Sequence, residues 1–239
     1  MTPTHGTMMA DSPPNISTLT PEELLGPLND VEQRYAPKML HVAGIQTFPL
    51  PKPRVAIVGS RKASSNAIKT TSSIAKTLVK NGVIIVSGLA EGIDTAAHVA
   101  AIGNQGRTIA VLGTPLDRTF PAKNHTLQQA IMRHHWAVSQ FPSSHPTTPK
   151  DFVLRNRTMA LIANASIIIE AGETSGSLHQ GWEALRLGRP LFIWKTLIEN
   201  PKLSWPRKMI DYGALVLKKP DDVLNNLPSS GQVILVPKS

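Results

Sequence analysis

From Arg54 onward, short runs of apolar residues alternate with longer segments in which apolar residues recur every three or four positions. The runs Val55–Val58 and Val83–Val86 are continuous, which is typical of strands buried on both faces of a parallel sheet. Between them, residues 66–81 place their apolar side chains on one helical stripe, and Gly82 follows as a C-cap. Strands joined by helices through short connections favour right-handed crossovers, so we predict an α/β fold with a doubly wound, mostly parallel sheet.

The same alternation continues along the chain. The other predicted strands are 108–112, 137–139, 167–169, 191–194 and 214–217. The other predicted helices are 94–104, 125–134, 152–163, 177–187, 208–212 and 221–227.

The first 53 residues have a different character. Residues 1–19 are rich in Thr, Ser, Pro and Met without periodicity and are predicted to be a disordered lead-in. Thr20-Pro21-Glu22-Glu23 predicts a capping box that starts a short helix, and the prolines that follow predict an extended strap up to residue 53. Residues 54–228 then form the domain, and 229–239 a C-terminal tail.

The charge of the chain is unevenly distributed. The net charge is +9, but residues 1–49 carry 2 basic and 5 acidic side chains, so residues 50–239 have a net charge of +12. A basic domain is expected of a protein that binds a polyanion, although charge alone fits a generic basic protein equally well. The chain has no cysteine, no apolar run of about 20 residues and no basic-then-apolar leader, so we expect a cytoplasmic protein without disulfides, thiolate metal sites or membrane association.

Ligands of doubly wound sheets bind beyond the carboxyl ends of the strands, so the residues there are candidates for a site. Gly59-Ser60-Arg61 follows the first strand of the domain, where glycine allows close approach and Arg61 offers a planar fork for phosphate. Ser87-Gly88 follows the second strand, and the loop after the third contains Phe120, Lys123 and Asn124. An aromatic side chain near a lysine suits base stacking and phosphate neutralisation. The turn lacks the Gly-x-Gly-x-x-Gly pattern, so a nicotinamide or flavin cofactor is not expected.

A fourth candidate segment runs from Phe152 to Arg189. Here a strand ends at Glu170, and Ser175-Gly176-Ser177 opens a helix whose free first-turn amides favour an anion. Arg155 and Arg157 are two residues apart on a helix and point about 200° from each other, so they cannot share a phosphate. We expect one to face the crevice and the other to pair with a carboxylate such as Glu170.

Taken in order, these motifs resemble the DprA/Smf family of DNA-processing proteins over about four-fifths of the chain. The residues that carry the resemblance are the Gly-Ser-Arg turn at 59–61, Ser-Gly-Leu-Ala-x-Gly-Ile-Asp at 87–94, Gly-x-x-Leu-Asp at 113–117, Pro121, Asn124, Phe152-x-x-Arg155-Asn156-Arg157, Glu170-Ala171, Ser175-Gly176-Ser177 and Gly188-Arg189-Pro190. The resemblance implies an extended Rossmann-like domain that binds single-stranded DNA and is not an enzyme. It also implies a homodimer that protects incoming DNA and loads the recombinase RecA in transformation or recombination.

By this resemblance Arg61 and Lys123 lie at a DNA-phosphate pocket that Ser87 and Gly88 line. The predicted DNA- or phosphate-binding set is Gly59, Ser60, Arg61, Ser87, Gly88, Lys123, Asn124, Arg155, Arg157, Ser175, Gly176 and Ser177. No catalytic residue, metal ligand or cofactor is predicted.

The chain also departs from the family pattern. His179-Gln180-Gly181 replaces the usual Thr-Ala after Ser-Gly-Ser, Lys195-Thr196 replaces Pro-Gly, and little sequence after Leu227 remains for a winged-helix domain. One alternative is a nucleoside-monophosphate phosphoribohydrolase of the lysine-decarboxylase-like group. In those enzymes a Glu stands where this chain has Gln180, with Glu183 one helical turn later as a substitute. Another alternative is a nucleotide-sensing module without catalysis, which predicts saturable mononucleotide binding.

Overall fold

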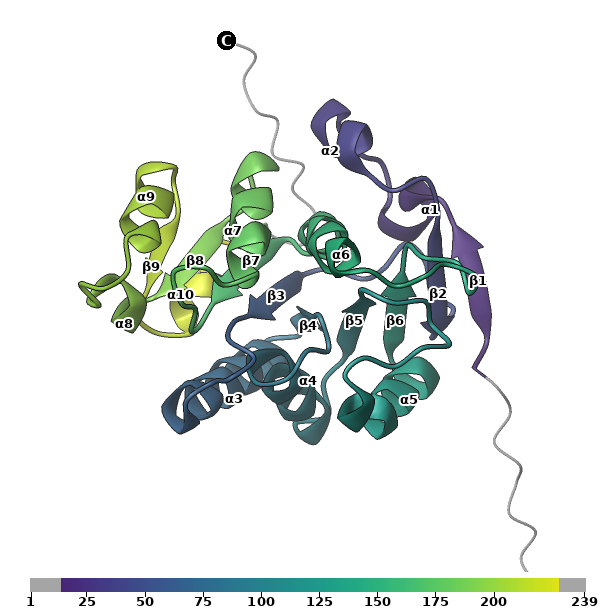
Figure 1. Ribbon diagram of the computed structural model, residues 1–239, viewed down its shortest axis with the longest axis horizontal. Coiled ribbons are helices and arrows are strands. Elements are labelled where there is room, and N and C mark those ends of the chain that lie inside the picture. Colours follow the sequence, from purple (N-terminus) through teal and green to yellow (C-terminus); the bar gives the residue numbers. More distant parts are fainter. Residues whose placement is uncertain (1–13, 228–239) are drawn as a thin grey trace, which may run out of the picture.

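A single nine-stranded sheet organises the computed structural model, which describes residues 14–227 (Figure 1). Its strands are β1 (Ile16–Leu19), β2 (Leu40–Gly44), β3 (Arg54–Val58), β4 (Ile84–Ser87), β5 (Thr108–Leu112), β6 (Trp136–Ser139), β7 (Ala165–Ile168), β8 (Leu191–Trp194) and β9 (Leu215–Leu217). They lie in the order β1-β2-β6-β5-β4-β3-β7-β8-β9.

The seven strands from β6 to β9 are parallel, whereas β1 and β2 extend the sheet antiparallel at one edge. The chain moves outward from β3 to β6, then returns to place β7 on the other side of β3. The switch point therefore lies between β3 and β7, and the predicted doubly wound α/β fold is confirmed.

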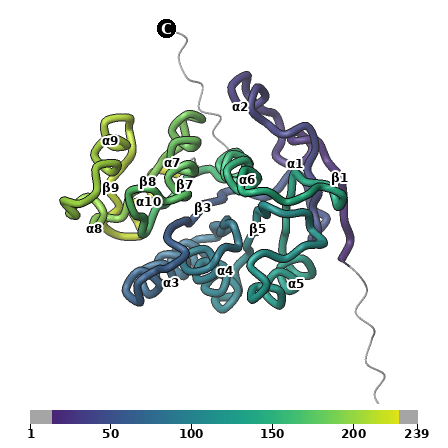
Figure 2. The backbone as a smooth tube through the Cα atoms, in the orientation of Figure 1, coloured from purple at the N-terminus to yellow at the C-terminus, as the bar shows by residue number. Residues whose placement is uncertain are grey.

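Helices cover both faces of this sheet (Figure 2). The helices are α1 (Pro21–Leu25), α2 (Asp30–Tyr35), α3 (Ser65–Lys80), α4 (Ile93–Gly103), α5 (His125–His134), α6 (Pro149–Ile162), α7 (Ser177–Arg186), α8 (Lys195–Ile198), α9 (Trp205–Asp211) and α10 (Asp221–Leu224), with a 3-10 turn η1 (Ala122–Asn124). In the views of Figures 1 and 2, α3, α4 and α5 lie below the sheet and α1, α6 and α7 above it.

The side chains of β3 show how one strand serves both layers. Ala56 and Val58 belong to the core cluster that contains residues of α1, α6 and α7, whereas Val55 and Ile57 belong to the cluster with residues of α3 and α4. All five residues of β3 are buried. This two-sided burial is the physical reason for the continuous apolar run in the sequence.

Most predicted elements are found within a few residues of their expected bounds. The largest shift is at α6, which begins at Pro149 instead of Phe152 because Thr148 and Asp151 form a capping box, with the Thr148 amide donating to Asp151 Oδ2 at 2.6 Å. The short helix α8 was not predicted. Among the described residues, no helix is both long and apolar enough to span a membrane.

The N-terminal segment has more structure than expected. The predicted capping box at Thr20 is present, but residues 16–19, assigned to the disordered lead-in, form β1. The predicted strap contains α2, which Asn29 and Glu32 cap reciprocally, and β2, which pairs with β6. Residues 1–13 of the lead-in and the predicted tail 229–239 lie outside the described residues.

Candidate functional site

The loops that follow β3 and β7 meet at the switch point of the sheet. The Ser60 amide donates to the Glu170 carbonyl oxygen at 2.6 Å. The Glu170 carboxylate accepts hydrogen bonds from the Ser64 amide at 3.0 Å and the Ser64 hydroxyl at 2.6 Å, at the start of α3. A side chain at Gly59 would lie 2.8 Å from the Glu170 carbonyl oxygen, so only glycine fits between the loops. Glu170 therefore fastens α3 to β7 and does not pair with an arginine as predicted.

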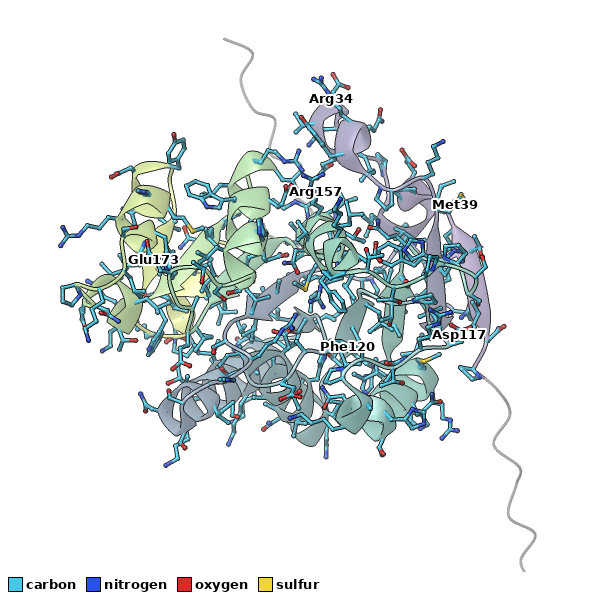
Figure 3. All side chains as sticks on the ribbon, viewed as in Figure 1. Arg34, Met39, Asp117, Phe120, Arg157 and Glu173 are labelled. Carbon is cyan, nitrogen blue, oxygen red and sulfur yellow. The ribbon has the colours of Figure 1, made fainter. Side chains whose placement is uncertain are left out.

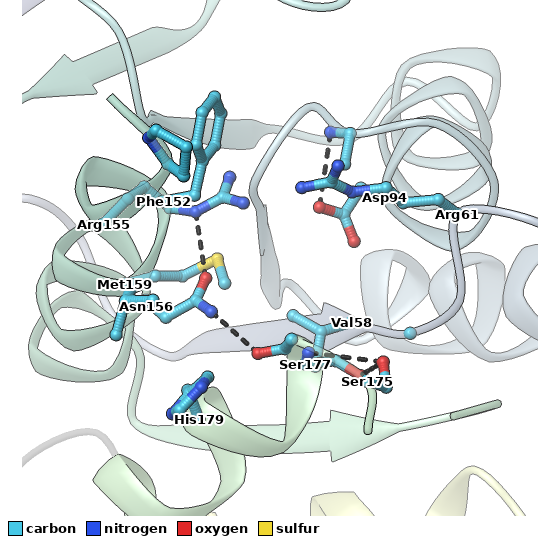
Figure 4. A pocket seen from close by; sticks show the side chains of 15 residues that line it. Val58, Arg61, Asp94, Phe152, Arg155, Asn156, Met159, Ser175, Ser177 and His179 are labelled. Carbon is cyan, nitrogen blue, oxygen red and sulfur yellow. Dashed lines mark hydrogen bonds between the residues drawn. The ribbon is translucent and has the colours of Figure 1, made fainter. Parts of the chain in front are cut away.

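Two adjoining pockets open at this junction. The inner pocket has a volume of about 400 Å³ and the outer pocket about 240 Å³. Arg61, Ala90, Phe152 and Arg155 line both, so we treat the two as one cleft. Figure 4 shows the inner pocket with the α6 side chains on one side, Arg61 and Asp94 opposite, and Ser175, Ser177 and His179 below. Further lining residues are Val58, Gly59, Pro149, Val153, Asn156, Met159 and Gly176 in the inner pocket, and Lys62, Gly88, Glu91, Phe120 and Pro121 in the outer pocket.

Arg155 and Asp94 are buried charges at the base of the cleft. The Arg155 guanidinium donates through Nη1 to the carbonyl oxygens of Gly88 and Val111 and through Nε to Asn156 Oδ1. Asp94 Oδ2 accepts from the amides of Gly88 and Ala90 at 3.2 and 3.3 Å, so it ties down the loop instead of capping α4. Burial raises the pKa of the Asp94 carboxyl and lowers the pKa of Arg155, while their mutual attraction opposes both shifts. The two charges largely compensate each other.

Gly88 is packed directly against this buried arginine. A Cβ atom at residue 88 would overlap the Arg155 guanidinium. The glycine predicted to line a phosphate site therefore has a second role, which is to leave room for Arg155 beneath the loop.

The outer pocket combines exposed cations with an aromatic surface. Phe120, labelled in Figure 3, is 51% exposed, and its ring centroid lies 5.2 Å from that of Phe152. The Arg61 guanidinium lies 5.8 Å from the Phe152 ring centroid, within cation–π range. Lys62, next in sequence, lines the same pocket. Exposed rings beside arginine and lysine can stack on a flat base and neutralise phosphate.

Lys123 lies at the rim of the outer pocket. Its Nζ is 2.5 Å from Glu91 Oε2, and Glu91 is the residue of this pair that lines the pocket. The Lys123 and Glu91 side chains are 61% and 40% exposed, so this is a solvent-accessible ion pair. Lys123 is thus close to the cleft, but a carboxylate already holds its charge.

The first turn of α7 forms another wall of the inner pocket. The Ser175 and Ser177 hydroxyls are 2.7 Å apart, and Asn156 Nδ2 donates to the Gly176 carbonyl oxygen at 3.0 Å. No side chain caps this helix start. Its amides and hydroxyls, with the exposed His179, present donors to the pocket.

Three predicted site residues lie away from the cleft surface. Ser87 is fully buried and donates to the Ile57 carbonyl oxygen, and Asn124 is 5% exposed and donates to Leu89 O and Thr95 Oγ1. Arg157 points to α7, where its Nε is 3.1 Å from Glu183 Oε1. The opposite orientation of Arg155 and Arg157 was predicted, but the carboxylate partner is Glu183 and not Glu170.

The structure adds cleft residues that were not predicted. Lys62, Glu91 and His179 line the pockets. Lys62 has a sequence signal, since it directly follows Arg61 in the same loop, whereas His179 stood out only as a departure from the family pattern. Within residues 14–227, no group of three or more His, Asp or Glu side chains is arranged to hold a metal ion.

The residues needed by the phosphoribohydrolase alternative do not face the cleft. Gln180 is fully buried and hydrogen-bonds Ser166. Glu183 bridges Arg157 and Arg186. Neither is among the lining residues of the two pockets, so Glu183 does not substitute for the glutamate of those enzymes.

A family model described as DNA recombination-mediator protein A matches residues 20–228. The DNA processing protein DprA of Bacillus subtilis is 30% identical over 80% of this chain and 65% of that protein. The DprA of Streptococcus pneumoniae is 38% identical over 72% of this chain and 61% of that protein. The chain thus spans less than two thirds of the length of these two relatives.

Solved structures give the same result. The S. pneumoniae DprA structure superposes with a TM-score of 0.77 at 33% identity, covering 89% of this chain and 75% of that one. DNA processing protein A from Helicobacter pylori, whose structure is described for its single-stranded DNA binding mode, gives a TM-score of 0.74 at 25% identity over 88% of this chain and 94% of that one. A molybdenum cofactor binding protein from Rippkaea orientalis shares the fold, with a TM-score of 0.53 at 15% identity.

Proposed function

The chain belongs to the DNA recombination-mediator protein A family, the DprA/Smf proteins, and from this premise we propose that its cleft binds single-stranded DNA. The observation that carries the proposal is the meeting of Arg61, Lys62 and the exposed Phe120 at one opening. Phosphate neutralisation and base stacking are the two interactions that sequence-independent single-strand binding requires.

Each part of the cleft has a distinct task in this proposal. Arg61 and Lys62 neutralise phosphates, and Phe120 stacks a base with Phe152 supporting it from behind. The first turn of α7, with Ser175 and Ser177, donates hydrogen bonds to a phosphate in the inner pocket. The buried pair of Arg155 and Asp94 fixes the loops and contributes little net charge.

Ser87, Asn124 and Arg157 act indirectly in this scheme. Ser87 ties β4 to β3, and Asn124 holds the loop that carries Phe120 and Lys123 against the loop containing Leu89. Their substitution therefore changes DNA binding through loop position. Gly59 and Gly88 keep the loops close, and Ser60 fixes the turn that presents Arg61.

The biological role follows from the family. The chain acts by binding in DNA uptake or recombination, with RecA as the protein that receives the strand and with a homodimer as the working form. Catalysis is not part of the proposal, because the carboxylates that line the cleft are engaged: Asp94 by two backbone amides and Glu91 by Lys123.

A titration of labelled oligothymidine at several salt concentrations tests this function. The logarithm of the affinity is expected to fall linearly with the logarithm of the salt concentration, with a slope of about −0.7 per phosphate neutralised. Tight binding without salt dependence would contradict the proposal.

Competition experiments separate the alternatives. Unlabelled single-stranded DNA is expected to displace the label better than duplex DNA, and better with increasing length. Complete displacement by AMP at low concentration would favour the nucleotide-sensing module instead. Release of adenine from AMP, lost on Glu183→Ala, would favour the phosphoribohydrolase.

A further inference from the structure

The exposed face of α7 continues outward from the inner pocket. His179 lines the pocket, and Trp182 and Arg186 follow three and seven residues later, so the three side chains share one face of the helix. His179 and Trp182 are exposed, while Gln180, Gly181 and Ala184 are buried against the body of the protein. We call His179, Trp182, Arg186 and the neighbouring Tyr212 the α7 stripe.

Two aromatic rings of the stripe form a platform at the surface. Trp182 is 37% exposed and Tyr212, which follows α9, is 73% exposed. Their ring centroids are 5.4 Å apart with an edge-to-face angle of 83°. Gly181 packs against Met209, which holds α7 and α9 together beneath the rings. Figure 1 shows α7 standing between α6 and α9.

The surroundings of the platform are positively charged. Arg157 and Arg186 both contact the single Glu183 carboxylate, so this triplet keeps a net positive charge. The Arg157 side chain is 47% exposed, and the Arg186 guanidinium lies 3.7 Å from the Tyr35 ring centroid. Exposed rings next to surplus guanidinium charge match the chemistry of a polynucleotide better than that of an apolar protein surface.

The platform is also close enough to the cleft for one strand to reach both. Three residues of helix separate His179 from Trp182, a rise of about 4.5 Å along the axis. Stacked bases in one strand are spaced by about 3.4 Å. A strand that leaves the inner pocket past His179 therefore meets the Trp182 ring within one or two nucleotides.

We propose that the α7 stripe is a second single-stranded DNA subsite, in which a base stacks on Trp182 and Tyr212 and Arg186 and Arg157 face the adjoining phosphates. This inference rests on the proposed function, since it extends the strand bound in the cleft. It assigns a ligand to a face that none of the cleft residues explains.

Oligonucleotide length distinguishes the subsite from the cleft. An oligothymidine of about 5 nucleotides fills the cleft alone, whereas one of about 20 covers the stripe as well. Trp182→Ala is expected to weaken binding of the long oligomer about 5- to 150-fold, the usual effect of losing one stacked base, and to change binding of the short one less than about twofold. Trp182→Phe keeps a ring and is expected to retain most of the affinity.

Two controls make the outcome decisive. Val99→Ala removes an exposed apolar side chain of α4, on the opposite face of the sheet, and is expected to leave both affinities unchanged. In the parent, the long oligomer is expected to quench tryptophan fluorescence more than the short one, and Trp182→Phe to abolish this difference. The fluorescence measurement uses a variant that keeps the ring, so it is independent of the stability of Trp182→Ala.

Failure of this inference differs from failure of the proposed function. If neither oligomer binds the parent, the proposed function fails and this subsite with it. If both oligomers bind the parent and Trp182→Ala binds them equally well, the subsite is refuted and the aromatic pair is assigned to a protein contact instead.

Discussion

Replacing Glu91 by glutamine is expected to tighten the binding of single-stranded DNA by about 1.4- to 5-fold. Glu91 lines the outer pocket, and its Oε2 lies 2.5 Å from Lys123 Nζ. A DNA phosphate has to displace this carboxylate before it contacts Lys123. Exposed ion pairs of this kind contribute about 0.2–1 kcal/mol, and release of that energy corresponds to the expected gain in affinity.

Fluorescence anisotropy with labelled oligothymidine measures the effect. The gain is expected to disappear when Glu91→Gln is made in a Lys123→Ala background, because the lysine is then no longer present to be released. Glu199→Gln on α8 removes the same charge from the exposed C-terminal end of that helix and is the matched control. Weaker binding by Glu91→Gln, or an equal gain without Lys123, would refute the competition between carboxylate and phosphate.

Arg61→Ala is expected to make the salt dependence of DNA binding shallower by about 0.7 in log–log slope, measured by titration at several salt concentrations; an unchanged slope would show that Arg61 contacts no phosphate. Gly88→Ala is expected to destabilise the fold by about 1–3 kcal/mol, because the new methyl group overlaps the Arg155 guanidinium, and an unchanged thermal midpoint would contradict this packing. Burial lowers the pKa of His98 to about 3 from 6.5, so the unfolded chain binds a proton that the folded protein does not. Stability is therefore expected to fall by about 2 kcal/mol from this group between pH 7.5 and 5, and His98→Gln to reduce that dependence in urea unfolding; equal pH dependence in parent and variant would argue against a neutral buried His98.

The parallel part of the fold was predictable because its strands are buried on both faces. Such strands appear as continuous apolar runs, and β3 and β8 match their predicted positions closely. The antiparallel edge was not predictable in the same way. β1 has four residues, and its pairing with β2, and that of β2 with β6, joins segments far apart in the sequence.

The position of the site was predictable for a similar reason. Carboxyl ends of neighbouring parallel strands share one edge of the sheet, so the loops at Gly59, Gly88 and Ser175 were expected to meet. The orientation of individual side chains was not predictable, because it depends on tertiary partners. Ser87 and Asn124 point inward to carbonyl oxygens, and Lys123 pairs with Glu91, a contact between two different loops.

Photochemical cross-linking of a thiothymidine-substituted oligonucleotide tests the central claim most directly. If the cleft holds the strand, mass spectrometry of the digested adduct is expected to find the cross-links in peptides that contain Phe120, Phe152 or the loop at Arg61. Excess unlabelled single-stranded DNA is expected to suppress them. Cross-links found mainly at the opposite edge of the sheet, around Lys52 and Arg189, would contradict the account.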